Sequence, residues 1–229
     1  MRLGRTGVIE YYSGVFFACV RRFGKGRVSA RLRSVGVSAD FFERPPKFYL
    51  MASVFSHAAV ALAIGRLSTR QSMPPRFWWL SILCSILPDA DVLSFIAGIH
   101  YGDLFGHRGF THSLSFALIL SAVVVQIWFR DVRAWSRTWT LLISHFFFVT
   151  ASHGMLDAIT NGGLGVAFFA PFENSRYFLP WRPVQVSPIG IAPFFSRYGL
   201  DVLISEIVWI WIPVGVSLST AQILKKKVL

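Results

Sequence analysis

Five long apolar segments constrain the fold of this chain more than any other feature of its sequence. They are residues 52–67, 77–99, 113–129, 138–160 and 200–224. A membrane-spanning helix needs roughly 20 largely apolar residues, and all five segments come close, the first being the shortest. In lipid, only helices and closed barrels satisfy their own backbone hydrogen bonds. We therefore expect an all-α, polytopic transmembrane helical bundle with about five membrane-associated helices.

The composition agrees with a membrane protein. Hydrophobic residues make up 54% of the 229 residues and charged residues only 15%, which is unusual for a soluble globular domain. Cys19 and Cys84 both lie in apolar surroundings and indicate neither a disulfide framework nor a thiolate metal site. The net charge of +12 does not come from a contiguous basic face, so we expect no nucleic-acid partner.

Basic residues between the apolar segments predict the orientation of the bundle, because cytoplasmic loops gather Lys and Arg. Placing three such clusters in the cytoplasm is consistent with five crossings, and it puts residues 100–112 and 161–199 on the non-cytoplasmic side. The clusters are Arg66, Arg70 and Arg76; Arg130, Arg133 and Arg137; and Lys225, Lys226 and Lys227.

The basic N-terminus conflicts with this orientation, because ten Lys/Arg against three Asp/Glu in residues 1–50 should resist translocation. Residues 1–50 could be an upstream extension with Met51 as the functional start. Alternatively, residues 8–20 could form an extra membrane-associated helix, or the first segment could be re-entrant. We favour the first explanation. The expected organisation is a basic extension over 1–50, flexible or partly helical, and a membrane-embedded domain over 51–229.

Metal-capable side chains from four elements collect near the non-cytoplasmic ends of the segments. Ionisable groups at membrane depth are costly and usually mark function, and convergence on one face is what a metal site requires. The candidate ligands are His57, Asp89, Asp91, His107, His112, His153 and Asp157.

Local spacing allows these groups to converge. His153 and Asp157 are four residues apart, so they share one face of a helix. Asp89 and Asp91 would point roughly 200° apart on a regular helix, but Pro88 interrupts the helical hydrogen bonds and can turn both carboxylates toward one pocket.

The second motif, "GHRGFTHS", places His107 and His112 in the loop before the third segment. A tight turn at Gly109 would bring the two imidazoles together. Thr111 or Ser113 could cap the helix that follows.

The ligand types indicate the metal. Mixed nitrogen and oxygen ligands without thiolate favour zinc, with manganese or iron as alternatives. The set suffices for one ion with outer-shell partners, or for two ions sharing a carboxylate. His100 and His145 stay outside it. His145 lies eight residues before His153, about 12 Å along a helix, and is expected to be structural or an outer-shell residue.

Five stretches together resemble a known family: "SHAAVALAIG", "LPDADVL", "GHRGFTHS", "SHGMLDAITNGG" and "RYFLPWRPVQVSPIG". They are similar to the YdjM-like family of bacterial membrane-bound metal-dependent hydrolases, from about Met51 to the C-terminus. The resemblance implies a multi-pass inner-membrane protein with a divalent metal and hydrolase activity. It also implies that the seven candidate ligands are ligands or catalytic groups. The family's similarity to zinc-dependent phospholipase C suggests phosphoester substrates.

We therefore expect metal-assisted hydrolysis of a phosphoester or another small amphiphilic or lipid substrate at the non-cytoplasmic face. A bound divalent ion lowers the pKa of water, and Asp89 or Asp91 would act as general base. Arg108 either pairs with an anionic substrate group or contacts a headgroup.

The loop after the fourth segment adds further candidates on the same face. Arg176 and Arg182 could meet phosphate. Membrane lipids are expected partners of the aromatic residues in this loop, which are typical interfacial anchors. These are Tyr177, Phe178 and Trp181.

Two other functional classes remain open. The cluster could form a metal or proton transport path, but ionisable residues elsewhere in the segments are few, with His145 and Glu206 as candidates. Alternatively, the metal could only hold together a non-catalytic membrane protein.

The orientation gives a first prediction. A reporter domain fused after Trp135, between the third and fourth segments, should report a cytoplasmic location, because three arginines flank this loop. Alkaline phosphatase fused there should be inactive. Active phosphatase at this position would overturn the proposed orientation.

Overall fold

The computed structural model describes residues 53–69, 72–187 and 196–228. The chain divides into two compact units, Met1–Lys47 and Phe48–Leu229, and the described residues all belong to the second. The expectations for residues 1–50, including a helix over 8–20, lie outside the described residues. Among the described residues no strand forms, although two isolated β-bridges join Thr160 to Val184 and Val166 to Tyr177.

Five helical segments make up the described part of the chain, which confirms the expected all-α class. They are α3 (Val54–Ser68); α4 (Pro75–Ile86), continued by the 3-10 helix η2 (Leu87–Ala97); α5 (Leu114–Trp128), preceded by the short 3-10 helix η3 (Phe110–His112); α6 (Arg137–Ala158); and α8 (Arg197–Glu206), continued by the π-helix η4 (Ile207–Trp211) and α9 (Ile212–Val228).

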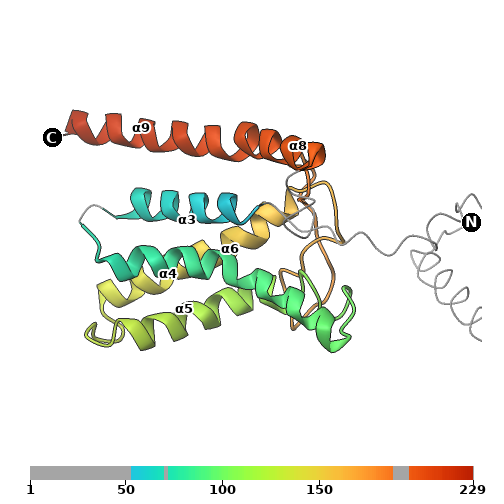
Figure 1. The fold of residues 1–229 in the computed structure, drawn as a ribbon. Coiled ribbons are helices and arrows are strands. Elements are labelled where there is room, and N and C mark those ends of the chain that lie inside the picture. Colours follow the sequence, from blue (N-terminus) through green and yellow to red (C-terminus); the bar gives the residue numbers. More distant parts are fainter. Residues whose placement is uncertain (1–52, 70–71, 188–195, 229) are drawn as a thin grey trace, which may run out of the picture. The chain divides into compact units, whose positions relative to one another are not determined.

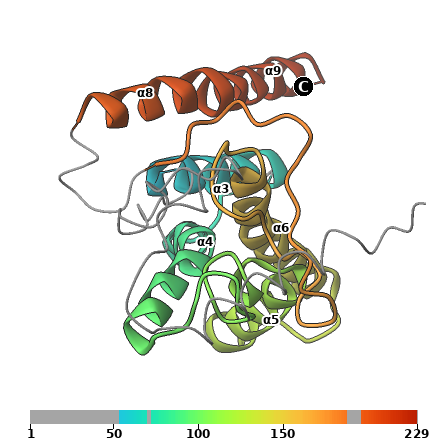
Figure 2. The same ribbon diagram turned by 90° about the vertical axis from the view of Figure 1, so that its right-hand side faces the viewer.

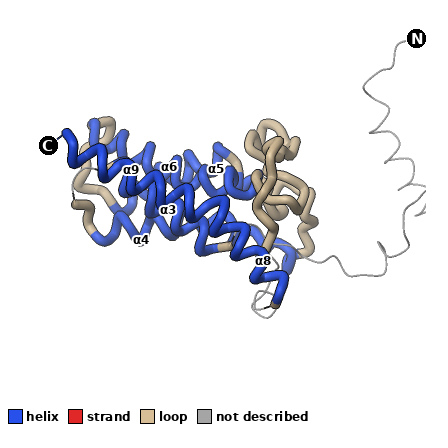
Figure 3. Tube along the Cα trace, turned by 90° about the horizontal axis from the view of Figure 1, so that it is seen from above, coloured by secondary structure: helices blue, strands red, loops and turns tan. Residues whose placement is uncertain are grey.

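Helix α3 lies between the C-terminal helix and the rest of the second unit. It packs against α4 and α6, and its other side contacts α9 (Figures 1 and 2). Helix α5 packs mainly on α6. The two long loops after η2 and after α6 gather at one end of the helices (Figure 3). This end receives the N-terminus of α3 and the C-terminus of α6, and both carry candidate ligands.

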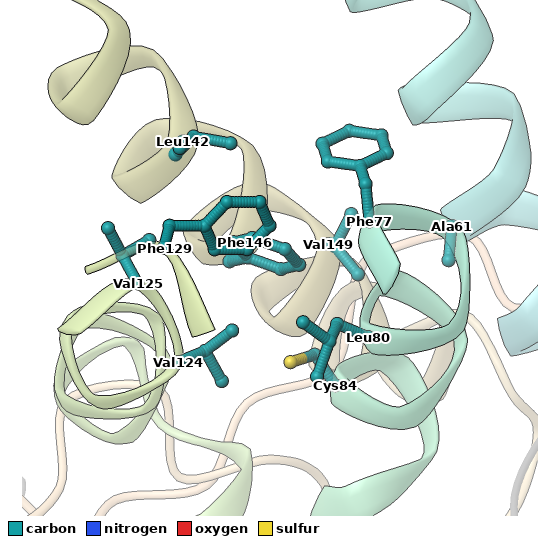
Figure 4. Close-up of a cluster of buried hydrophobic side chains, with 10 residues drawn as sticks. All are labelled: Ala61, Phe77, Leu80, Cys84, Val124, Val125, Phe129, Leu142, Phe146 and Val149. Carbon is teal, nitrogen blue, oxygen red and sulfur yellow. The ribbon is translucent and has the colours of Figure 1, made fainter. Parts of the chain in front are cut away.

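An apolar core holds α3, α4, α5 and α6 together (Figure 4). Phe146 of α6 is fully buried at its centre and lies beside Phe77 and Phe129, with ring centroids 5.8 Å away in each case. The other members come from all four helices or their ends: Ala61, Leu80, Cys84, Val124, Val125, Leu142 and Val149. The buried thiol of Cys84 is thus a packing group, as its apolar surroundings in the sequence indicate.

The outer faces of the helices are apolar, as expected for a bundle in lipid. Large side chains such as Trp79 (72% exposed) and Phe148 (60%) point outward, whereas Ser81, Ser121 and His145 are buried. A soluble domain shows the opposite preference. Pro75–Ala97 and Arg197–Lys226 are long and apolar enough to cross a membrane. Val54–Ser68 and Leu114–Trp128 are shorter apolar helices, so the expectation of five crossings stays a prediction.

The basic clusters lie at the end of the bundle opposite the long loops. Lys225 near the end of α9 donates to the carbonyl of Arg66 near the end of α3, over 3.4 Å. Arg76 at the start of α4 lies 3.4 Å from Asp131 in the connection between α5 and α6. Arg70 and the side chain of Lys227 lie outside the described residues. The two ends therefore differ in charge, in the sense that the predicted orientation requires.

The core gives a second prediction. Phe146→Ala removes a fully buried ring and should lower the free energy of unfolding by about 2 kcal/mol, less than in a soluble core because packing rather than transfer from water stabilises helices in lipid. Thermal unfolding in detergent measures this change. Phe148→Ala, on the outward face of the same helix, is the matched control and should have little effect. Equal losses for the two variants would contradict this description of the core.

Candidate metal centre

Three helical segments deliver five of the seven candidate ligands to one point at the loop end of the bundle. Asp89 and Asp91 lie in η2, which forms because Pro88 cannot donate the amide hydrogen bond that would continue α4. His112 ends η3, and His153 and Asp157 occupy the last turns of α6. The predicted local departure from α-helix at the Pro88 sequence is therefore confirmed, and its form is a 3-10 helix.

Four side chains form the centre of the cluster. One ligand atom each from Asp89, His112, His153 and Asp157 lies within 4.8 Å of the others. His112 Nε2 is 3.0 Å from His153 Nε2 and 3.1 Å from Asp157 Oδ2, and His153 Nε2 is 3.1 Å from Asp89 Oδ1. The three residues of the cluster other than Asp89 are buried, whereas the side chain of Asp89 keeps 18% of its surface exposed.

Hydrogen bonds on the far side of each imidazole aim both histidines at this centre. His153 Nδ1 donates to the Ser85 carbonyl over 2.7 Å, and His112 Nδ1 lies 3.1 Å from Asp91 Oδ2. Each ring then carries its hydrogen on Nδ1 and presents the lone pair of Nε2 to the cluster. This is the arrangement by which metal-binding histidines are fixed in proteins.

The separations within the cluster fit one small cation. Zinc bonds of about 2.0–2.1 Å in tetrahedral geometry place neighbouring ligand atoms about 3.3 Å apart. Five separations among the four ligand atoms run from 3.0 to 3.6 Å. Moreover, Asp89 Oδ1 and both oxygens of Asp157 are buried without a hydrogen-bond partner. Acceptors turned toward one another at these distances repel unless a cation or a proton lies between them.

Asp91 and His107 play a different geometric part. His107 Nδ1 lies 2.6 Å from Asp91 Oδ1, and Thr111 donates to Asp91 Oδ2 over 2.6 Å. These are hydrogen-bond distances, too short for two ligands of one zinc ion. Asp91 also accepts the backbone N–H of Arg108, so both of its oxygens are engaged. In this structure Asp91 orients His112 and ties the motif loop to η2.

The charges of the centre suit a divalent ion. Three carboxylates (Asp89, Asp91 and Asp157) and one guanidinium (Arg108) leave two negative charges when the imidazoles are neutral. Removing such charges from water is costly unless they are paired. A divalent cation at the four-donor centre would balance them, so the residues present fit the metal that the sequence predicts.

Arg108 is fully buried and its donors face the protein. Nη1 donates to the Gly162 carbonyl over 2.8 Å and Nη2 to Thr160 Oγ1 over 3.0 Å, while Nε lies 3.6 Å from Asp157 Oδ2. A substrate anion would have to displace these bonds, so the expected substrate contact of Arg108 stays a prediction. What the contacts support is that Arg108 holds Asp157.

Two glycines let the chain pass close to these groups. A Cβ on Gly109 would lie 2.2 Å from the Leu104 carbonyl oxygen, which confirms the need for a tight turn before α5. Gly163, with φ of +84°, leaves no space for a Cβ beside Arg108 and Tyr101. Burial raises the pKa of the Tyr101 hydroxyl, so this neighbour of the guanidinium stays neutral.

His57 reaches the cluster from a fourth helix. Its ring stacks on that of His153 with centroids 3.9 Å apart, and its Nε2 lies 3.7 Å from Asp157 Oδ1. It is fully buried, and neither ring nitrogen has a hydrogen-bond partner. The structure thus brings all seven predicted ligands to one place, four as a compact donor set and three around it. Their role as ligands stays a prediction.

The remaining candidates lie around this centre. Arg176 donates to the carbonyls of His107, Tyr101 and Asp103, so it fastens the two long loops to each other. Arg182 is exposed and stacks over Phe178 at 4.5 Å.

The predictions for His100 and His145, which lie outside the predicted ligand set, and for the cap of α5 agree with the structure in part. His145 pairs with Ser81 over 2.8 Å and stacks on Phe77, as a structural residue would, and the side chain of His100 is exposed. Of the two predicted caps of α5, Ser113 accepts the N–H of Phe116, whereas the Thr111 hydroxyl donates to Asp91. Sequence reasoning missed the Ser85 carbonyl and the Thr111 hydroxyl as orienting groups, although Thr111 lies within the motif.

Comparison with known proteins agrees with the sequence motifs. The family described as YdjM inner membrane protein matches residues 51–228. The inner membrane protein YbcI of Escherichia coli (strain K12) is 42% identical over 168 residues, which is 71% of this chain and 92% of YbcI. No solved structure matches. The match covers most of the chain and confirms the resemblance seen in the motifs, so the chain belongs to the YdjM inner membrane protein family.

Proposed function

We propose that this protein is a metal-dependent hydrolase of the inner membrane, with zinc at the four-donor centre on the non-cytoplasmic side. The observation that carries the proposal is the convergence of Asp89, His112, His153 and Asp157, with both imidazoles oriented from behind. The alternatives for the metal are manganese and iron, which accept the same nitrogen and oxygen ligands. The name of YbcI and the apolar helices support the location.

The chemistry that a divalent ion supplies when bound here is Lewis acidity, which brings the pKa of water toward about 7. The protein's part is to take up the proton. Asp89 suits this role better than Asp91, because its side chain is 18% exposed against 2% for Asp91, and its Oδ1 has no hydrogen-bond partner. Asp91 already accepts hydrogen bonds on both oxygens. Arg108 holds Asp157 in place.

The proposed substrate is a phosphoester or another amphiphilic molecule that reaches the centre from the bilayer surface. Of the three candidate arginines, Arg182 has the most accessible guanidinium for its anionic group, because it is exposed, whereas the donors of Arg108 and Arg176 are bound to the protein. Trp181 (59% exposed) and Tyr177 (38%) lie in the same loop. Such aromatic residues commonly lie at the headgroup level of a membrane, where a lipid substrate would be held.

A structural metal is the second candidate function, and one observation favours it. Four protein donors fill a tetrahedral zinc site, as in structural centres, whereas catalytic centres keep a position for water. Hydrolysis here requires that Asp89 leaves the metal coordination to a water molecule, or that the coordination number increases to five. Metal content and turnover must therefore be measured separately.

Metal content is the third prediction. Protein purified in detergent should hold about one zinc ion per chain, and His153→Ala should lose it, because one of four donors is removed. Elemental analysis measures the content. His145→Ala removes a buried histidine of the same helix that pairs only with Ser81 in the core, so it should keep the metal. A wild-type protein without stoichiometric metal would refute the proposed function.

Turnover is the fourth prediction. Asp89→Asn should lower kcat for a chromogenic phosphodiester by about 10²–10⁴-fold, the usual contribution of a general base, while the amide oxygen can still bind the ion. Asp103→Asn is the control: Asp103 is an exposed loop carboxylate that accepts the backbone N–H of His100, so this variant should keep the wild-type rate. Metal-loaded protein that turns over no phosphoester, ester or amide, and that unfolds on chelation, would establish the structural role instead.

A further inference from the structure

A buried carboxylate outside the metal centre lies in the last apolar helical segment. Glu206 ends α8 and has no exposed surface. Its Oε1 accepts the backbone N–H of Ser53, and its Oε2 accepts the hydroxyls of Ser53 and Ser56, over 2.5 Å and 2.8 Å. An acidic residue in an apolar span is costly, and all three donors come from the start of α3.

These bonds supply what the first turn of α3 lacks. The first N–H groups of a helix have no partner within the helix, and an anion there interacts favourably with the helix dipole. Ser53 is the N-cap of α3, but its own side chain makes no capping bond. Glu206 caps the helix from a distance, 153 residues along the chain.

The π-helix that follows Glu206 adds a second clamp. Five residues on an α-helix turn through about 500°, which leaves the last about 140° from the first. In η4 the N–H of Ile212 bonds to the carbonyl of Ile207, five residues back, and this wider turn brings Trp211 toward the side of Glu206. Trp211 Nε1 donates to Ser56 Oγ over 2.8 Å. Ser56 is thus held by both Glu206 and Trp211.

The clamped turn carries His57. The His57 ring stacks on that of His153, with centroids 3.9 Å apart and an interplanar angle of 18°. Its Nε2 lies 3.7 Å from Asp157 Oδ1. No hydrogen bond fixes the His57 ring nitrogens, so its place depends on the backbone of the first turn. The ring in turn limits the rotation of His153, whose Nε2 belongs to the donor set.

We propose that Glu206, assisted by Trp211, is a positioning residue of the metal centre: it fixes the first turn of α3 and thereby holds His57 against His153 and Asp157. The inference rests on the proposed function in that its first readout is metal affinity. Glu206→Gln tests it, because an NH2 group replaces one acceptor oxygen and the charge is lost, so that the two serine hydroxyls or the Ser53 N–H no longer have the acceptor that the carboxylate offers.

A double-mutant cycle is the fifth prediction. Glu206→Gln should weaken zinc binding by about 10–100-fold, as outer-shell changes do, when His57 is present, and should have no further effect in His57→Ala. Competition with a chelator measures the affinity, and the visible spectrum of the cobalt-substituted protein reports ligand geometry. Asp201→Asn, an exposed acid on the same helix, should match wild type in both. Equal losses with and without His57 would overturn the proposal.

A second readout does not depend on metal. Diethylpyrocarbonate modifies accessible imidazoles, so His57 should be protected in the wild type and in Asp201→Asn, and modified in Glu206→Gln. Mass spectrometry of peptides locates the adduct. Trp211→Phe removes a single donor, the Nε1–H that bonds to Ser56. It is the replacement test if Glu206→Gln does not fold, and a smaller increase in His57 modification is expected. If the wild type binds no metal, the proposed function fails, and unchanged His57 protection in both variants then refutes the positioning role as well.

Discussion

The structure depends on one constraint: polar groups inside an apolar bundle must find partners in the protein, because the surroundings offer none. Four buried side chains satisfy it. His153 is fixed by the Ser85 carbonyl, His112 by Asp91, Asp157 by Arg108, and Glu206 by the start of α3. Asp89 Oδ1 and both oxygens of Asp157, which face the four-donor centre, lack such partners, and so do both ring nitrogens of His57 beside it. These unpartnered groups meet where a cation could be held.

Departures from regular α-helix occur next to the polar groups. The change from α4 to the 3-10 helix η2 places Asp89 and Asp91 on two sides of His112. The π-turn η4 follows Glu206 and brings Trp211 to Ser56. Both irregular turns thus lie where the bundle gathers its buried charge.

The two ends of the helices are built for different surroundings. Arg66, Arg76 and Lys225 mark one end, where Lys225 donates to the carbonyl of Arg66 and Arg76 pairs with Asp131. The other end holds the long loops, bound together by Arg176. Between them lies an apolar core around Phe146. The charged centre thus lies at one end of the apolar core and not in its middle.

The sequence by itself determined the all-α class, the helical segments and the identity of the residues that meet at the centre, because apolar length, histidine spacing and Pro88 act locally. It also indicated that Ser113 or Thr111 would cap α5. Only the tertiary structure decided how the seven residues divide. Whether a carboxylate faces the centre, as Asp89 does, or a neighbouring imidazole, as Asp91 does, depends on contacts between helices far apart in the chain. The same holds for Arg108, whose partners Thr160 and Gly162 follow α6, and for Glu206, whose partners lie 153 and 150 residues away. Local sequence patterns do not predict such pairings, because the partner of a buried charge depends on how helices far apart in the chain pack together.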